Sequence, residues 1–287
     1  MASMRDIKTK ITATRKTSQI TKAMNMVSAS KLRKADKKYK TFHPLVMKVK
    51  GIVENILSTD PDIQHPLLTP REIKKTGYIL ITSDRGLAGP YNTNVLKTFH
   101  KITSQHASKD EYFVGTIGFK GYSYCKRSKH PLINEESINS RDEVQFIDFQ
   151  AMARTFIQFY IDGVVDKIVV IHSHFVNTIT HQVQETTILP ITDLMKDSSK
   201  RINDYLYEPS ADVILSELLP IYVENTLYGI ILDAKASEHA SRMTAMKNAS
   251  DNAKEVITTL NLYYNRARQG SITKELTDII GGANAVS

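Results

Sequence analysis

Cysteine is almost missing from the sequence: Cys125 is the only one among 287 residues. A single cysteine excludes an internal disulfide framework and is typical of a reducing compartment. No apolar run approaches the roughly 18 residues that a membrane-spanning helix needs. The opening residues, MASMRDIKTK, also have no apolar core of signal-peptide length. We therefore expect a protein that is soluble or bound peripherally to a membrane.

Acidic residues are scarce at the start of the chain. The first 50 positions hold fourteen Lys and Arg against Asp6 and Asp36, a formal charge of +12, while the rest of the chain sums to −4. Such a segment predicts an acidic partner: nucleic acid, anionic lipid or an acidic protein surface. A solvated helix face explains the charge equally well. The lysines are not interleaved with aromatic residues, which disfavours nucleic acid.

Apolar or small residues recur at alternating steps of three and four over the first 57 positions. This is a heptad seam that predicts a long packed helix, about 80 Å for about 54 residues. Pro44 is expected to bend or loosen it. The seam is small and polar in its middle and consists of Met4, Ile7, Ile11, Thr14, Ser18, Thr21, Asn25, Ser28, Leu32, Ala35, Tyr39, Phe42, Val46, Val49, Val53 and Ile56.

The end of the chain has the same character. Neither Gly nor Pro occurs between Gly229 and Gly270, a helical stretch SITKELTDII follows, and residues 211–228 are helical in spacing despite Pro220. Small residues in this seam allow a partner helix to approach closely. The predicted seam is Ala236, Ala240, Met243, Met246, Ala249, Ala253, Val256, Leu260, Tyr263 and Ala267.

Between these helices, short β-rich runs alternate with helical stretches. The runs are GYILITS, EYFVGTIG and KIVVIHSHF, and the helical stretches lie at about 92–106, 118–129 and 148–161. This alternation predicts an α/β unit with a largely parallel sheet.

Both long helices flank that unit in sequence, so if they pair, they pair antiparallel. The predicted fold class is α/β: a long antiparallel coiled coil of N- and C-terminal helices plus a central Rossmann-like α/β domain. The predicted bounds are 1–57 for the N-terminal shaft helix, 76–205 for the head domain and 211–287 for the C-terminal shaft helix.

A glycine-bearing loop follows the first predicted strand, in GYILITSDRGLAGPYN, residues 77–92. A strand, a glycine loop and a helix often cradle a phosphate, and Asn92 is placed like the helix cap. However, the loop lacks the G-x-G-x-x-G spacing and the Walker lysine, and Pro90 removes an N–H donor. The alternative is a structural turn, in which Asp84 and Arg85 serve local pairing or a protein contact. The turn residues are Asp84, Arg85, Gly86 and Gly89.

Candidate metal and catalytic residues are sparse. His172 and His174 share one face of a predicted strand, but a third ligand at useful spacing is missing, although His181 is seven residues on. Glu238 and His239 are adjacent but do not form H-E-x-x-H, and no nucleophile elbow is present. We expect no catalytic residue, no cofactor and no metal.

Several segments of the sequence resemble those of one known family. MASMRDIKTKITATRKTSQITKAMNMVSASKLRKA is similar to the N-terminus of the gamma subunit of F-type ATP synthases. TSDRGLAGPYN resembles its central signature, and YLYEP and the region from ASEHASRM to GGANA resemble its C-terminal half. No chloroplast-type cysteine pair is present, so the likeness is to the bacterial form. Ala88-Gly89-Pro90 stands where many relatives carry Cys-Gly-Gly.

The resemblance implies a non-catalytic rotor. In the family, gamma is the central stalk that couples proton flow through the membrane c-ring to ATP synthesis on the beta subunits. The implied partners are the alpha, beta and epsilon subunits and the c-ring, with no nucleic acid. The implied location is peripheral, on the cytoplasmic side of the cell membrane.

Motif matching carries the family's contact positions onto this chain. Those implied to touch the beta levers are Lys22, Met24, Lys31, Arg33 and Lys34. Those implied to touch the beta catch loops are Arg268, Gln269, Thr273, Glu275 and Asp278. Those implied to form the foot on the c-ring are Tyr205, Tyr207 and Glu208.

Two other classes remain as alternatives. An α/β enzyme with helical extensions would turn over a substrate as an isolated chain. A nucleic-acid-binding coiled coil would bind DNA in a salt-sensitive way at physiological ionic strength.

Overall fold

The computed structural model of the chain describes residues 3–59, 63–140, 145–178, 180–192, 194, 207–208 and 210–286. By its internal contacts the chain divides into two units. Unit 1 comprises residues 1–28 and 243–287, and unit 2 comprises residues 29–242. Two long helices contribute to both units: α1, Met4–Thr59, and α5, Ala211–Val286.

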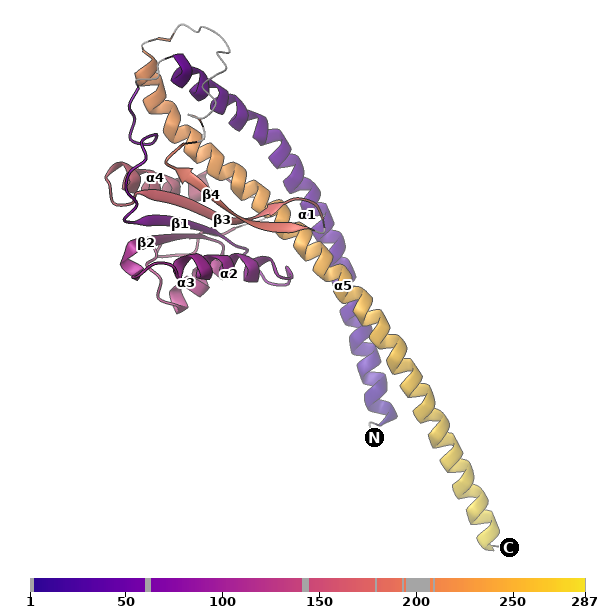
Figure 1. The fold of residues 1–287 in the computed structure, drawn as a ribbon. Helices are drawn as coiled ribbons and strands as arrows, with labels where there is room; N and C mark the ends of the chain where they lie inside the picture. The colour runs from indigo at the N-terminus through magenta and orange to yellow at the C-terminus, as the bar shows by residue number, and fades with distance from the viewer. Residues whose placement is uncertain are drawn as a thin grey trace. The chain divides into compact units, whose positions relative to one another are not determined.

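A four-stranded sheet lies at the centre of unit 2, in the order β2-β1-β3-β4 (Figure 1). Strands β1 (Thr76–Ile81), β2 (Tyr112–Ile117) and β3 (Lys167–Phe175) are parallel, and β4 (His181–Leu189) pairs antiparallel with β3. All six residues of β1 are buried, which explains why its sequence is an unbroken apolar run rather than an alternating one.

Helices cover both faces of the sheet. On one face, α2 (Tyr91–Thr103) and α3 (Phe119–Arg127) enclose a cluster that includes Tyr78, Leu80 and Phe99. On the other face, α4 (Ile147–Ile161) and the unit 2 segments of α1 and α5 pack on a larger cluster. Successive strand residues alternate between the two clusters because side chains alternate across a strand.

The sheet brings α4 unusually close through two glycines. A Cβ built on Gly115 would lie 2.5 Å from Cε2 of Phe156, and one on Gly77 would lie 2.8 Å from Cε1 of the same ring. The Phe156 side chain is 1% exposed. Glycine at both positions therefore allows the aromatic ring to rest directly on the backbone of β1 and β2.

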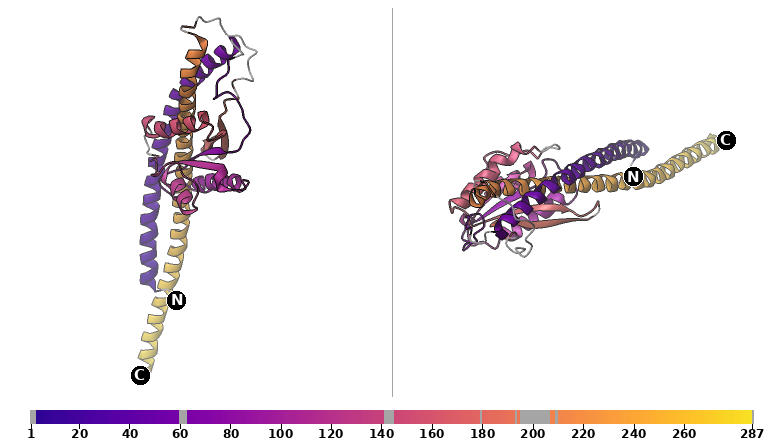
Figure 2. Two further views of the ribbon diagram at one scale, coloured as in Figure 1. Left: turned by 90° about the vertical axis from the view of Figure 1, so that its left-hand side faces the viewer. Right: turned by 90° about the horizontal axis from the view of Figure 1, so that it is seen from above.

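In unit 1, α1 and α5 form an antiparallel pair (Figure 2). Asn25 donates from Nδ2 to the carbonyl oxygen of Met243 at 2.7 Å, and the Ser18 and Ser250 hydroxyl oxygens are 3.5 Å apart. Both contacts fit the same antiparallel register of α1 and α5. Polar side chains thus join the helices where the seam has few large apolar residues.

The predicted seam is correct for α1 from Ile7 onward, Met4 being exposed, and partly wrong for α5. The α1 seam positions from Ile7 to Ile56 are all buried or half-buried. On α5, Val256 and Tyr263 are 48% and 55% exposed, whereas Ile257 and Tyr264 are half-buried. The seam takes a step of four after Ala253 where the prediction took three, whereas the predicted Leu260 and Ala267 are half-buried as expected.

The last part of α5 extends past the start of α1 within unit 1. The register of the polar pairs places Met4 opposite about residue 264, so later residues have no helical partner among the residues described in unit 1. Four large apolar side chains there are 49–68% exposed: Ile272, Leu276, Ile279 and Ile280.

The predicted fold class is confirmed. The α/β domain with its three parallel strands is present, and the structure adds strand β4, which the sequence pattern did not predict. Pro44 and Pro220 both lie inside continuous helices. The predicted domain bounds stay a prediction.

Candidate functional surfaces

The loop after β1 is held to the rest of unit 2 by Asp84. Its Oδ1 accepts hydrogen bonds from the backbone N–H of Phe119 at 3.0 Å and of Ser140 at 3.1 Å. Phe119 is the first residue of α3, so the carboxylate satisfies an N–H that a helix start leaves without a partner inside the helix. Asp84 thereby joins three segments that are far apart in the sequence.

The glycine part of the same loop docks onto α5. The Ser241 hydroxyl donates to the Ala88 carbonyl oxygen at 2.6 Å, and Ala88 is buried. Leu87 and Gly89 have φ values of 61° and 55°, a left-handed conformation that Gly adopts readily and Leu rarely. The loop therefore uses its carbonyl groups and its backbone bend to contact α5.

The predicted helix-capping role of Asn92 is wrong. Helix α2 begins at Tyr91, its N-cap position is Pro90, and no side chain caps it. Asn92 Oδ1 instead accepts from the backbone N–H of Ser83 at 3.0 Å, and its Nδ2 donates to the Ser83 hydroxyl at 2.7 Å. Asn92 thus binds the end of β1 to α2. The turn residues Arg85 and Gly86 are exposed.

A buried charge cluster lies on α5 beneath this loop. Glu238 accepts from Lys235 Nζ at 2.8 Å and from Arg242 at 2.8 Å, and its side chain is 5% exposed. Burial alone raises the pKa of Glu238, but the charges of Lys235 and Arg242 outweigh it, so the pKa is lowered. The carboxylate is therefore ionised at neutral pH, and Arg242 reaches the Arg85 carbonyl oxygen at 3.5 Å.

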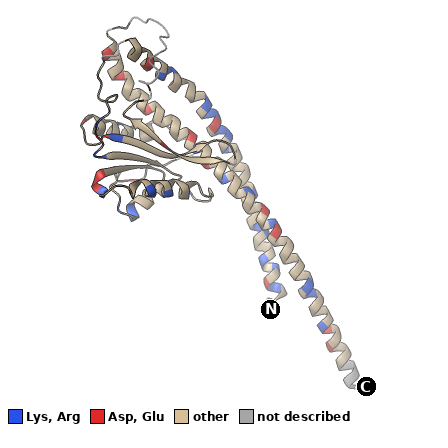
Figure 3. Cartoon of the chain, in the orientation of Figure 1, with Lys and Arg blue, Asp and Glu red and all other residues tan. Residues whose placement is uncertain are grey.

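The candidate beta-lever residues lie along α1, where Lys and Arg greatly outnumber acids (Figure 3). In unit 1, Lys22 is exposed and Met24 is half-buried. In unit 2, Lys31 is half-buried, and Arg33 and Lys34 are exposed. The exposed members leave their charges in contact with solvent and open to a partner.

All five candidate beta-catch residues lie on the exposed last part of α5. Within that segment the Ser271 hydroxyl is 3.5 Å from Glu275 Oε1, and the Thr277 hydroxyl donates to the Thr273 carbonyl oxygen at 2.9 Å. These contacts are local to the helix. The exposed set is Arg268, Gln269, Thr273, Glu275 and Asp278.

The candidate foot is described in part, because Tyr205 lies outside the described residues. Tyr207 is half-buried, packs against the larger core cluster and accepts from Asn55 Nδ2 at 3.0 Å. Glu208 beside it is exposed. Tyr207 is therefore anchored to α1 within unit 2 and leaves the adjacent carboxylate accessible.

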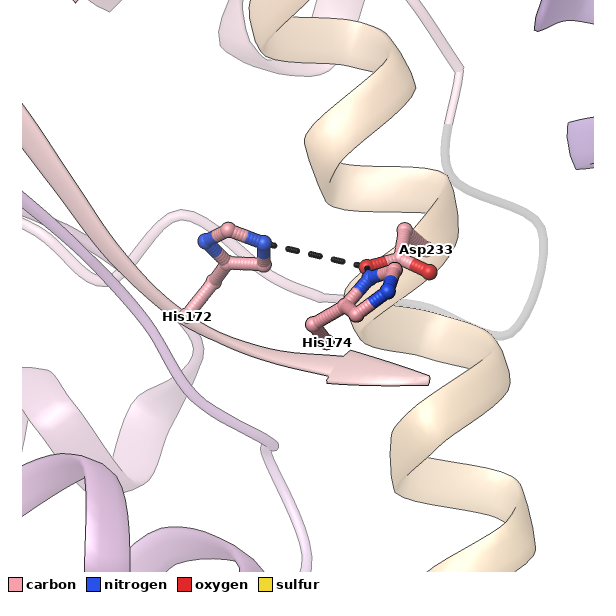
Figure 4. Close-up of side chains that lie close together, drawn as sticks. All are labelled: His172, His174 and Asp233. Carbon is pink, nitrogen blue, oxygen red and sulfur yellow. Dashed lines mark hydrogen bonds and ion pairs between the residues drawn. The ribbon is translucent and has the colours of Figure 1, made fainter. Parts of the chain in front are cut away.

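Asp233 is a third ligand-type side chain beside the two histidines, and the sequence pattern did not predict it. His172 and His174 of β3 converge on Asp233 of α5 (Figure 4). His174 Nδ1 is 2.8 Å from Asp233 Oδ2, and His172 Nε2 is 3.7 Å from the same oxygen. Asp233 is about 60 residues away in sequence, on an element that shows no metal motif, so spacing gave no signal for it.

These surfaces define a class of protein. No helix among the described residues is long and apolar enough to cross a membrane. The loop after β1 contacts α5, and most of the exposed large apolar side chains lie on α1 and α5. The chain thus combines an α/β domain with two long helices that expose apolar and basic side chains.

Comparison with known proteins assigns the class to a family. The sequence model of a family described as ATP synthase matches residues 3–286. Among solved structures, the chain is similar to one from the Tetrahymena thermophila mitochondrial ATP synthase central stalk and c-ring, with 26% identity and a TM-score of 0.60 over 80% of this chain and 99% of that one.

Two Euglena gracilis structures share the fold at lower identity. A chain of the mitochondrial ATP synthase rotor in rotational state 1 has 15% identity and a TM-score of 0.63, covering 94% of this chain and 98% of that one. A chain of the OSCP, F1 and c-ring structure in rotational state 3 has 16% identity and a TM-score of 0.65, covering 99% and 94%.

The chain belongs to the gamma-subunit family of the F-type ATP synthases. It is a non-catalytic subunit of the central stalk, the rotor, in a membrane-associated complex whose catalysis takes place on the beta subunits.

Proposed function

We propose that the chain is the rotor shaft of a bacterial F-type ATP synthase. Its outer helix pair turns inside a ring of alpha and beta subunits, and its α/β domain rests with epsilon on the c-ring. The complex lies at the cytoplasmic side of the cell membrane, and proton flow through the c-ring drives the rotation.

The observation that carries this proposal is the exposed end of α5. Residues after about 265 form a single helix with large apolar side chains in solvent, including Ile279 at 68% and Ile280 at 58% exposure. A single helix of about 20 residues is marginal in water, and a row of exposed apolar side chains marks an interaction site. A surrounding ring of alpha and beta subunits would bury the apolar side chains that this segment exposes.

Hydrogen exchange tests whether the ring of alpha and beta subunits encloses the end of α5. In the isolated chain, amides of residues 266–281 should exchange fast and those of β1 and β3 slowly, because only the strands are buried. After assembly with alpha and beta subunits, residues 266–281 should become protected. Protection that is equal in the free and the assembled chain would refute the proposed insertion.

The basic face of α1 supports contact with acidic beta levers. Arg33 and Lys34 are exposed, so replacing both by glutamate should shift stability by only about 0.5 kcal/mol each. Like charges across an interface cost several kcal/mol, so ATP-driven proton pumping by the assembled enzyme should fall sharply. The loss should lessen as salt rises, since exposed charges are screened over about 8 Å at physiological ionic strength.

A matched control uses exposed lysines of α2. Lys97→Glu and Lys101→Glu together change the net charge equally, and both residues are exposed. This variant should pump normally. If the Arg33 and Lys34 variant is fully incorporated and pumps as well as the control, α1 presents only a solvated face, and the lever assignment is wrong.

A further inference from the structure

His172, His174 and Asp233 lie close enough together to bind one metal ion. Two imidazoles and one carboxylate converge from two elements of unit 2, with their ligand atoms all within 4.8 Å of one another. Two nitrogen ligands and one oxygen ligand suit borderline divalent ions of the zinc class. Ligands on separate elements, β3 and α5, would be joined by the ion.

The distances between the ligand atoms are close to those in a zinc site. Tetrahedral zinc with bonds of about 2.0–2.1 Å places its ligands about 3.3 Å apart. The two contacts to Asp233 Oδ2, 2.8 and 3.7 Å, lie on either side of that separation. The contact from His172 at 3.7 Å is too long for a hydrogen bond, so the present arrangement does not satisfy this nitrogen through Asp233.

Burial supplies an independent reason. His172 is 3% exposed, and its other ring nitrogen, Nδ1, is buried with no hydrogen-bond partner among the described residues. An ion bound at Nε2 would give this buried ring a polar contact.

Asp233 is a buried carboxylate with few polar partners among the described residues. Within the described residues its ion pairs are with the two histidines, and its Oδ1 accepts from the Phe175 N–H at a long 3.4 Å. A cation at this place would compensate a charge that the fold leaves costly.

We propose that His172, His174 and Asp233 form a binding site for a zinc-class divalent ion that clamps strand β3 to helix α5. The three side chains supply Nε2, Nδ1 and Oδ2, and water supplies the fourth position from the side where His174 is 37% exposed. The bound ion replaces the hydrogen bond between His174 and Asp233. The clamp is structural, and it is independent of the rotor function.

The test uses the full-length chain, stripped of metal by a chelator. Zinc titrated against a chromophoric competitor should bind at one equivalent and raise the melting temperature, because an ion that binds only the folded state stabilises it. Cobalt in place of zinc should give the intense visible absorption of a tetrahedral site. Weak absorption of octahedral type, or no saturable equivalent, overturns the proposal without any variant.

Variants then locate the ion. His174→Gln removes a partly exposed ligand, Asp233→Asn is isosteric, and each should weaken zinc binding by more than about tenfold, since even outer partners of metal ligands are worth 10–100-fold. His100→Gln, at an exposed position of α2, should bind as the unaltered chain does. Equal affinity for zinc in all four chains would mean adventitious binding by surface histidines and overturn the site.

Discussion

A methyl group added at Gly115 tests how closely α4 packs on the sheet. Its Cβ would lie 2.5 Å from Phe156 Cε2 and 2.9 Å from Met152 Sδ, where ordinary carbon contacts are about 3.5–4.0 Å. Both neighbours are buried, at 1% and 5% exposure, so the ring must shift by about 1 Å within a filled core. Overpacking of this kind costs about 1–3 kcal/mol.

Thermal unfolding of the isolated chain measures the effect. At about 2–4 °C per kcal/mol for a domain of this size, Gly115→Ala should lower the melting temperature by about 2–12 °C. Gly51→Ala is the control, because its Cβ meets nothing within 4 Å and it lies inside α1. That control should be neutral or stabilising by up to about 1 kcal/mol, since Ala favours helix over Gly.

The cause of the loss is tested by relieving the clash. Phe156→Leu alone should destabilise by leaving a cavity, but combined with Gly115→Ala it should cost less than the sum of the two. A coupling of about 1–2 kcal/mol in that direction is expected for residues in contact. If the two losses add to within about 0.5 kcal/mol, the ring is not what excludes a side chain at Gly115, and the packing argument fails.

Three further predictions concern the loop and the buried polar groups. Asp84→Ala should destabilise by about 1–3 kcal/mol in urea unfolding because two N–H groups lose their acceptor, whereas Asp84→Asn, which keeps an oxygen, should cost less than about 1 kcal/mol; equal losses would contradict this. The pKa of Glu238 is lower in the folded chain than its unfolded value of 4.5. Its ionised carboxylate therefore stabilises the fold above pH 4.5, and this stabilisation is lost as the pH falls through the folded pKa. The melting temperature of Glu238→Gln should therefore depend less on pH below about 5 than that of the unaltered chain. Burial raises the pKa of Cys125 to about 12, so iodoacetamide at neutral pH should label it far more slowly in the folded chain than in urea.

Local patterns in the sequence predicted the elements that have strong periodicity or continuous apolar character. The α1 seam could be read because its spacing persists over many turns, and β1 and β3 because parallel strands buried on both faces are apolar runs. Strand β4 was missed because most of it lies half-exposed at the sheet edge and reads HQVQETTIL, with few apolar residues. Its antiparallel pairing is a tertiary property that no local pattern encodes.

Contacts between distant segments could not be predicted in the same way. Asn92 has the residue type of a helix cap, yet its side chain binds Ser83, since α2 already begins at Tyr91. The sequence does not distinguish Ser241 from the other serines of α5, and its hydrogen bond to Ala88 is seen only in the structure. Asp233 likewise joins His172 and His174 only because α5 crosses the sheet near the end of β3.

The continuity of α5 constrains how the sequence can change. Within unit 1, one uninterrupted helix contains Ser250, which faces Ser18 of α1, and the exposed residues from Arg268 to Asp278. Because each helical residue adds about 100° and about 1.5 Å, inserting one residue between them would rotate everything beyond it and present a different face of the helix. Substitutions along this stretch leave that angular phase unchanged, but insertions and deletions do not. Its length should therefore be far less variable than its composition.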